Sequence, residues 1–429
     1  MRAHIKRFIQ GRLERYAKMA IARYQPTIIG VAGSVGKTST KEAIFCVLSK
    51  YLAVRKSAKS YNNEFGVPLT VLGIESGFRS IFKWMRMLRT AKQIATVGSP
   101  ASYPKCLVLE MGSDHVGDVA KLMAIAPPTI GVLTAIAPVH LEFFGTIENV
   151  QVEESTIIRN LDGKAIAIIN KEDAIIRQLE PETKATAVSY GLSDAADVWA
   201  DNIRLFSSDA EGNVGAECTV HAKGESIDIF LPHALGNGHV LSAVAAVAVG
   251  LQLKITLKDI AVALKEFLPP PGRMRMLSGI KKTHLIDDTY NSSPNAVALA
   301  LDALAKYPTK KVRYAVLGDM AELGAETVRL HTEVGKSVKQ FADCLITVGE
   351  KARDIARGAR ESGMQETAVF SFPNAGEAGH FLQDRIHEGD VVLIKGSQIV
   401  RMEKIVKEIM ANPERADTLL VRQETYWEK

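Results

Sequence analysis

A glycine-rich segment near the start of the chain carries the residue types that bind a nucleoside triphosphate. Residues 27–40 read TIIGVAGSVGKTST, in which an apolar run leads into a glycine-rich turn and then into a helical pattern at Lys41–Leu48. Glycines let backbone N–H groups close on phosphate oxygens, and a helix N-terminus adds a positive dipole end. Lys37 offers a mobile positive charge to the outer phosphates, and the Thr38 hydroxyl can ligate magnesium. The candidate phosphate ligands are Gly33, Ser34, Gly36, Lys37, Thr38 and Ser39.

The loop is a compact variant of the general phosphate-loop pattern. That pattern has glycine at the position where this chain has Val31, and the chain contains only the GSxGKT part of the pattern. A chance glycine turn would account for the glycines alone. It would not account for a strand, a loop, a Lys-Thr pair and a helix in that order, so we interpret the segment as a nucleotide site.

Two further polar residues follow predicted strands in the same half of the chain. Glu110 ends the apolar run CLVLE, and His140 follows the run GVLTAIAPVH. Ligands collect where parallel strands end on their carboxyl side, so both residues are candidates to hold a metal near Thr38. Magnesium prefers oxygen ligands, which makes a histidine ligand unusual on chemistry alone. Taken singly, each residue is equally well explained as a structural polar group.

The pattern of apolar runs predicts the elements that position these residues. Residues 185–232 have short alternating segments that suggest a small antiparallel insertion or an extra sheet. Before them, short apolar runs alternate with helical patterns, as in a parallel sheet covered by helices on both faces. These runs are Thr27–Ala32, Cys106–Leu109, Ile130–Thr134 and Ala165–Ile169. Helices are expected at Val240–Leu251 and Leu257–Phe267.

A proline run at 269–271 marks the clearest boundary in the sequence, because proline ends helices and stiffens a linker. Beyond it the strand–helix alternation starts again at Thr283–Ile286, Arg313–Leu317, Cys344–Val348, Ala368–Phe370 and Val391–Ile394. The predicted fold class is α/β: a phosphate-loop domain with a parallel sheet and an antiparallel insertion, then a Rossmann-like α/β domain. The predicted divisions are a basic amphipathic helix at 1–25, a nucleotide-binding domain at 26–268 and a C-terminal domain at 269–429.

The composition is that of an ordinary globular protein. Of 429 residues, 47% are hydrophobic and 24% charged, and the net charge of +5 is too small to argue for nucleic acid. The four cysteines lie far apart and are expected to be thiols in a reducing compartment. No stretch has the roughly 18 apolar residues of a membrane span, so we expect a cytoplasmic protein.

Two basic, partly apolar stretches stand out at residues 1–24 and 78–97. Either one could rest on an anionic membrane surface as an amphipathic helix. The simpler interpretation is that both pack their apolar faces on the protein and keep their charges in water. Peripheral membrane contact therefore stays an open alternative.

Eight ordered motifs between Thr27 and Lys404 resemble those of the Mur ligase family. They are GSVGKTST (33–40), YNNEFGVP (61–68), LEMGSDHVGD (109–118), APVHLEFFG (137–145), PGRMR (271–275), IDDTYNSSPNA (286–296), LGDMAELG (317–324) and IKGS (394–397). The resemblance implies ATP-dependent amide-bond formation: ATP phosphorylates a carboxylate, an amine attacks the acyl phosphate, and phosphate leaves. The chain most resembles members that add D-alanyl-D-alanine to a UDP-linked muramyl tripeptide in peptidoglycan precursor synthesis.

The resemblance also implies cofactors, partners and roles for single residues. It implies ATP and Mg²⁺, small-molecule substrates, no nucleic acid, and a monomer. Lys37 and Thr38 look like the β/γ-phosphate and magnesium ligands, and Lys395 like the lysine that faces the reaction centre. Glu110 and His140 resemble ligands of a second magnesium. Nucleotide contacts are implied for Arg273, Asp287, Asp288, Tyr290 and Asn291, and acceptor contacts for Asn62, Asn63, Glu64 and Gly66. The simpler explanations are an Asx-rich turn for DDTYN and a surface ion pair for Arg273.

Three departures from the family pattern lead to further expectations. The family ordinarily has an N-terminal domain that grips the UDP-sugar, whereas only residues 1–26 precede the predicted strand here. The acceptor is then held by other surfaces or by a partner, or is a different molecule. Glu154, with Glu153 beside it, stands where the family has a carbamylated lysine, so we hypothesise that Glu154 assists the second magnesium; two solvated glutamates are the alternative. Asn237 and His239 are candidates for a shifted adenine contact.

Two other functions stay open. One is a Mur-like amide ligase with another acceptor, such as a lipid-linked wall precursor. The other is a non-catalytic nucleotide-binding subunit. For a catalyst, residues 269–271 are expected to act as a hinge, because implied nucleotide contacts lie on both sides of them in the sequence, Lys37 before and Arg273 and Lys395 after.

Overall fold

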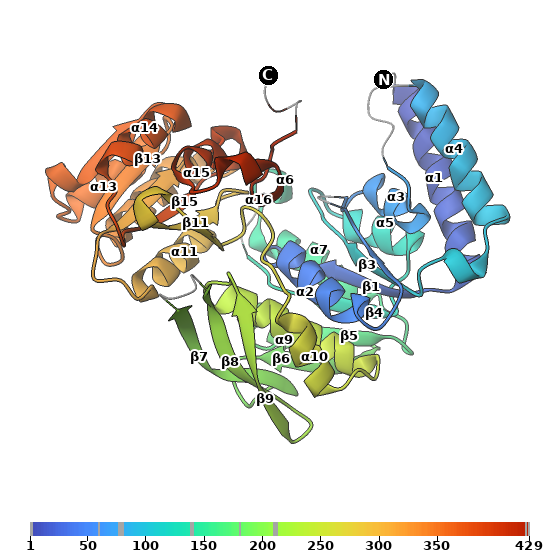
Figure 1. Cartoon of the computed structure of the whole chain (residues 1–429). Coiled ribbons are helices and arrows are strands. Elements are labelled where there is room, and N and C mark those ends of the chain that lie inside the picture. Colours follow the sequence, from blue (N-terminus) through green and yellow to red (C-terminus); the bar gives the residue numbers. More distant parts are fainter. Residues whose placement is uncertain are drawn as a thin grey trace. The chain divides into compact units, whose positions relative to one another are not determined.

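The computed structural model describes residues 3–58, 61–75, 81–137, 141–179, 182–208, 213–424 and 427 (Figure 1). These residues form two compact units. The first consists of Met1–Asn202, Cys218–Ile229 and Leu241–Phe267, and the second of Ile203–Glu217, Phe230–Val240 and Leu268–Lys429. The α/β fold class that the sequence predicts is confirmed, because both units are built on a mainly parallel sheet.

The first sheet has nine strands in the order β2-β3-β1-β4-β5-β6-β7-β8-β9. Strands β2 to β7 follow one another through parallel pairings. The bounds are β1 Thr27–Ala32, β2 Val54–Lys56, β3 Cys106–Glu110, β4 Ile130–Leu133, β5 Ile166–Asn170, β6 Thr186–Gly191, β7 Val198–Ser208, β8 Asn213–Ala222 and β9 Glu225–Pro232. Strands β3 and β4 are buried throughout, as expected for short apolar runs that are covered on both faces.

The alternating segment at 185–232 continues this sheet and does not form an extra one. Strands β8 and β9 are neighbours in the sheet and are joined by Lys223 and Gly224, whose φ angles are 53° and 81°. Two residues with positive φ make the tight turn of an antiparallel hairpin. The prediction of an antiparallel region was therefore right, and the structure places it at the sheet edge beyond β7.

Helices in this half of the chain are α1 Ala3–Tyr24, α2 Lys37–Ser49, α3 Gly66–Leu72, α4 Ile81–Thr96, α5 Asp118–Ile125, α6 Leu141–Phe144, α7 Ile147–Arg159, α8 Ala174–Leu179, α9 Asn237–Gln252 and α10 Leu257–Leu264. Figure 1 shows α1 and α4 running side by side. Ile9 and Leu13 of α1 and Trp84 and Met87 of α4 lie in the core of this unit. Both basic stretches thus pack their apolar faces on the protein. No helix within the described ranges is long and apolar enough to cross a membrane.

The second unit contains a six-stranded sheet in the order β10-β11-β15-β12-β13-β14, with β10 antiparallel to β11 and the other pairs parallel. Its strands are β10 Arg275–Ser278, β11 His284–Asp288, β12 Arg313–Gly318, β13 Cys344–Val348, β14 Val369–Phe372 and β15 Val391–Lys395. Its longer helices are α11 Pro294–Lys306, α12 Thr327–Val338, α13 Arg353–Glu361, α14 Ala375–Arg385 and α15 Glu403–Ile409. Strand β11 runs two residues beyond the predicted end, so Asp287 and Asp288 belong to it.

Candidate active site

The glycine-rich segment forms a tight turn between β1 and α2. Gly33 has a φ of 131°, and a Cβ there would lie 2.2 Å from Thr134 Oγ1. Gly36 has a φ of 88° and caps the N-terminus of α2. Both positions therefore require glycine. Ser34 N donates to Ala135 O at 2.7 Å, which ties the turn to the segment after β4.

Thr38 and Glu110 are brought together at the carboxyl ends of neighbouring strands. Glu110 ends β3 opposite Val31 of β1, and Thr38 Oγ1 donates to Glu110 Oε1 at 3.2 Å. Lys37 lies one residue earlier, with Nζ donating to Gly33 O inside the turn. Two oxygen ligands at right angles around Mg²⁺ are about 3 Å apart, since each Mg–O bond is about 2.1 Å. The Thr38 and Glu110 oxygens fit that spacing.

The other oxygen of the Glu110 carboxylate is buried. Among the described residues, Glu110 Oε2 accepts no hydrogen bond, although Lys41 Nζ lies 3.4 Å away. Lys41 is 1% exposed and donates to Ser57 O at 3.1 Å. The Lys41 ammonium forms a buried ion pair with this oxygen, so the fit to a metal rests on the spacing of Thr38 Oγ1 and Glu110 Oε1, which are oxygen ligands of the kind that magnesium prefers. The residues present therefore fit magnesium. The sequence did not single out Lys41, whose one signal is its position four residues after Lys37 on the same helix.

The two neighbouring glutamates of α7 make different contacts. Glu154 is 2% exposed, accepts from Gly33 N at 2.8 Å, and lies 4.0 Å from Lys37 Nζ. Glu153 accepts from Gly117 N and from Val119 N, the latter at 2.7 Å, at the start of α5. The alternative of two solvated glutamates is wrong, because both are buried. Glu154 contacts the phosphate turn, whereas Glu153 caps a helix.

The segment proposed to face the acceptor lies beside the end of β3. Asn62 O accepts from Gly112 N at 2.9 Å, just after Glu110. The Asn63 side chain accepts from Phe65 N and Gly66 N at 3.1 and 2.9 Å, so it is engaged in shaping its own turn. Glu64 is part of that turn and is half-buried. His140, the other candidate magnesium ligand, lies outside the described residues.

In the second unit, Lys395 is held at the carboxyl end of the sheet. It ends β15 opposite Asp288 of β11, and Nζ donates to Asp288 Oδ2 at 2.7 Å and to Asn291 O at 2.9 Å. Only 2% of the Lys395 side chain is exposed. Parallel strands thus bring two candidates together that are 107 residues apart in sequence.

Asp287 points to the opposite face of β11 from Asp288, as alternation along a strand requires. It is fully buried and accepts from Gly272 N at 2.9 Å and from Thr289 Oγ1 at 2.6 Å. Burial raises the pKa of Asp287 to about 6. This carboxyl therefore holds the segment after the proline run in place. Gly272 has a φ of 68°, which favours glycine in this turn.

Arg273 and Tyr290 form a stacked pair in the same unit, with the guanidinium carbon 3.7 Å from the ring centroid. Arg273 thus makes a cation–π contact in place of the surface ion pair that was its simpler explanation. His239 is buried, and its Nε2 lies 2.9 Å from Arg273 O. Desolvation lowers the pKa of His239. Asn237 is exposed at the start of α9, so of the two shifted candidates only His239 contacts the arginine segment.

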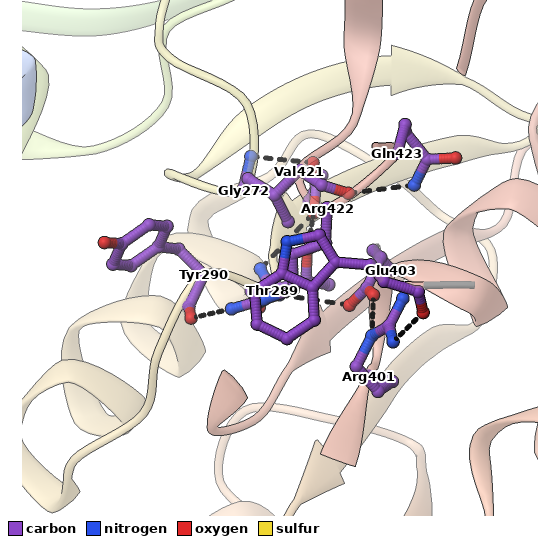
Figure 2. Close-up of polar contacts among 10 residues, drawn as sticks. Gly272, Thr289, Tyr290, Arg401, Glu403, Val421, Arg422 and Gln423 are labelled. Carbon is purple, nitrogen blue, oxygen red and sulfur yellow. Dashed lines mark hydrogen bonds and ion pairs between the residues drawn. The ribbon is translucent and has the colours of Figure 1, made fainter. Parts of the chain in front are cut away.

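A buried arginine that the sequence analysis missed supports this motif from the C-terminal segment. Figure 2 shows Arg422 pointing at the backbone of Thr289 and Tyr290 and at Glu403. Arg422 donates to Thr289 O and to Glu403 Oε2, both at 3.0 Å, and also to Tyr290 O. Glu403 is completely buried and also pairs with Arg401. No local pattern around Arg422 signals this contact.

Comparison with protein families finds a match for two segments of the chain. Residues 86–250 match the Mur ligase middle domain, and residues 272–398 match the Mur ligase glutamate ligase domain. The two matched segments include Glu110 and Glu154 in the first and Arg273, Tyr290 and Lys395 in the second.

Similar whole proteins and structures agree with these matches. The UDP-N-acetylmuramoyl-tripeptide–D-alanyl-D-alanine ligase of Mycobacterium leprae is 30% identical over 401 residues, covering 87% of this chain and 71% of the relative. The Escherichia coli protein of the same name is 28% identical, covering 90% and 77%. The crystal structure of MurF ligase from Thermotoga maritima in complex with ADP superposes with a TM-score of 0.76 at 26% identity, covering 93% of this chain and 83% of that one.

Proposed function

The chain belongs to the Mur ligase family, and from this we propose that it uses ATP and Mg²⁺ to join D-alanyl-D-alanine to the terminal carboxylate of a UDP-N-acetylmuramoyl-tripeptide. The reaction forms one amide bond and releases ADP and phosphate. The observation that carries the proposal is that relatives named for this reaction align along almost the whole chain. We further propose a cytoplasmic location, because all four cysteines are free thiols.

The phosphate turn is proposed to position the triphosphate for attack by the acceptor carboxylate. Both reactants are anions, so the site must hold them together and screen their charges. Lys37 and the N-terminus of α2 offer positive charge to the terminal phosphates. Thr38 and Glu110 would hold Mg²⁺, which neutralises phosphate charge when bound. Glu154 would orient the turn through Gly33 N and support the cation site as a carboxylate.

The second unit is proposed to supply Arg273 and Tyr290 to nucleotide binding and Lys395 to the reacting phosphate. The Arg273–Tyr290 stack presents a flat cationic surface. The ammonium group of Lys395 is fixed by Asp288 and Asn291 and does not swing freely. A fixed ammonium stabilises charge that develops on a phosphoryl group without having to reorganise during the reaction.

A second candidate is the same chemistry on a lipid-linked muramyl peptide. The observation that favours it is the packing of the acceptor segment against the two basic helices. The Phe65 ring lies 6.1 Å from the Trp84 ring of α4, and Lys6 Nζ of α1 lies 5.4 Å from the Phe65 ring. An acceptor that is anchored in a membrane would approach this segment next to basic residues.

Dipeptide-dependent phosphate release tests the proposal. The full chain is incubated with ATP, Mg²⁺ and D-alanyl-D-alanine, with either the UDP-linked or the lipid-linked tripeptide as acceptor. We expect release that needs both dipeptide and acceptor, is lost in Lys37→Ala, and is kept in Lys164→Ala, where the lysine is exposed. Turnover with only the lipid-linked acceptor would replace the first candidate by the second. Without acceptor-dependent release in the parent, the chain is a non-catalytic nucleotide-binding protein.

A further inference from the structure

The packed pair α1 and α4 carries a concentration of positive charge that the proposed reaction does not use. The two helices contain ten basic residues and one acidic residue, Glu14, a formal charge of +9. The whole chain has +5, so all other residues together carry −4. All ten basic side chains are exposed: Lys6, Arg7, Arg12, Arg15, Lys18, Arg23, Lys83, Arg86, Arg89 and Lys92.

The helices form one fixed layer. Their apolar sides are covered, since Leu13, Ala17 and Ala91 are completely buried in the core. Figure 1 shows the two helices lying along each other, so the exposed basic residues of both belong to one two-helix layer. A helix of 22 residues is about 33 Å long. Charges that lie within one Debye length of a surface, about 8 Å, interact with that surface together. The layer therefore acts as an extended cationic surface.

Exposed apolar side chains lie among these charges. Phe8 is 55% and Met85 51% exposed, one on each helix, with Arg7 and Arg86 as their neighbours in sequence. Arg12 lies over the Phe8 ring at 5.3 Å. Apolar groups between basic groups gain free energy where lipid headgroups meet acyl chains. The phosphate backbone of a nucleic-acid duplex offers them no comparable apolar environment.

We propose that the α1–α4 layer binds the surface of a bilayer containing anionic phospholipids. The binding is peripheral, because the buried sides of both helices stay in the protein core and only the exposed side meets the headgroups. Each Lys or Arg near an anionic membrane strengthens binding by roughly fivefold. The acceptor segment packs on this layer through Phe65, so an enzyme bound in this way presents that segment near the membrane. That last consequence rests on the proposed function, whereas membrane binding does not.

Vesicle co-sedimentation of the full chain tests the proposal. Vesicles of about 30% phosphatidylglycerol in phosphatidylcholine are compared with pure phosphatidylcholine at about 0.1 M salt. The test variant carries Arg7→Gln, Arg15→Gln, Arg86→Gln and Arg89→Gln. A matched control removes the same charge from exposed lysines elsewhere in the first unit: Lys164→Gln, Lys184→Gln, Lys258→Gln and Lys265→Gln. Thermal unfolding is measured for each variant to establish that it is folded.

We expect the parent and the control variant to bind anionic vesicles, and the four-arginine variant to bind at least about tenfold more weakly. Raising the salt to about 0.5 M should release the parent, and pure phosphatidylcholine should bind little. Equal loss in the two variants would overturn the proposal, because net charge alone would then decide binding. Tighter binding to a DNA duplex than to the vesicles would identify a nucleic-acid surface instead and would also overturn it. With the UDP-linked tripeptide as acceptor and no vesicles present, dipeptide-dependent phosphate release should be the same in both folded variants. Failure of membrane binding is therefore distinguishable from failure of the ligase.

Discussion

Lys395 and Asp288 end two neighbouring parallel strands and form a buried ion pair with a 2.7 Å contact from Nζ to Oδ2. The lysine is a candidate for the reacting phosphate, and its partner fixes where the ammonium group lies. Asp288 Oδ1 also accepts from Met274 N at 3.2 Å, next to Arg273. One carboxylate thus links Lys395 to the arginine segment within the same unit.

Replacing Lys395 should affect stability as well as activity. In Lys395→Met, the Asp288 carboxylate loses its cation in a buried site, so we expect about 3 kcal/mol less unfolding free energy. Adding Asp288→Asn to that variant should restore part of the loss, because no uncompensated charge stays buried. Urea denaturation of both single variants and the double variant measures this coupling. Lys404→Met, at an exposed lysine of the same unit, should change little. Additive losses would contradict the ion pair's role.

Glu154 should make the reaction independent of carbon dioxide. A glutamate carries its carboxylate permanently, whereas a carbamylated lysine loses it when carbon dioxide is removed. We therefore expect unchanged phosphate release in carbon-dioxide-depleted buffer. Glu154→Gln should lower kcat by at least about tenfold, because it removes the charge beside Lys37 and weakens the magnesium site.

Two variants make the Glu154 test specific. Glu154→Lys should regain activity only when bicarbonate is added, if the position is the one that needs a carboxylate. Glu153→Gln should lower stability, because its carboxylate accepts from Gly117 N and Val119 N, but it should not create bicarbonate dependence. A parent enzyme that is inactivated by removing carbon dioxide and rescued by bicarbonate would rule out the glutamate substitution.

Asp287 should make stability fall as the pH rises from about 4 to about 6. Its pKa is raised from 3.8 to about 6 by burial, so between these values the folded chain holds a proton that the unfolded chain has lost. Raising the pH through this window therefore costs stability, on the order of 3 kcal/mol, and above it the loss is complete. Asp287→Asn removes the titration. Urea denaturation from pH 4 to pH 7 measures the unfolding free energy of the parent and of the variant. The parent's value minus the variant's value should fall as the pH rises and should level off near pH 6. A constant difference would contradict the raised pKa.

Arg422 should support nucleotide binding without touching the nucleotide. Arg422→Met leaves the carbonyls of Thr289 and Tyr290 without their donor and Glu403 with only Arg401, at a cost of about 2–4 kcal/mol. Because Tyr290 stacks on Arg273, we also expect KM for ATP to rise more than kcat falls. Arg422→Lys should recover part of both effects. Arg353→Met, at an exposed arginine of the same unit, is the matched control. An unchanged KM in a folded Arg422→Met would contradict the positioning role.

Local patterns predicted the phosphate turn because its signals are local. The apolar run at Thr27–Ala32 forms β1 with the predicted bounds. The positive φ angles at Gly33 and Gly36 are indicated by the residue type, because glycine adopts them readily. The placement of Glu110 beside Thr38 also followed, since parallel strands end at one edge of a sheet.

Contacts between segments that are far apart in the sequence could not be predicted from local patterns. Glu153 and Glu154 are adjacent, and only the packing of α7 decides which one contacts Gly33. Arg422 contacts Thr289 at a separation of 133 residues, with no motif at either side to indicate the pair. The antiparallel segment at 185–232 was recognised from its alternation, but its attachment to β6 through β7 is a property of the assembled sheet.

Transfer of oxygen from the acceptor carboxylate to phosphate tests whether the chain activates that carboxylate with ATP. The acceptor tripeptide is labelled with ¹⁸O in its terminal carboxylate and incubated with ATP, Mg²⁺, D-alanyl-D-alanine and the full chain, and the released phosphate is analysed by mass spectrometry. Activation as an acyl phosphate predicts one labelled oxygen in phosphate for each amide bond and each ADP formed. Phosphate without label, while ADP accumulates, would show that ATP is hydrolysed by water and would contradict the ligase mechanism.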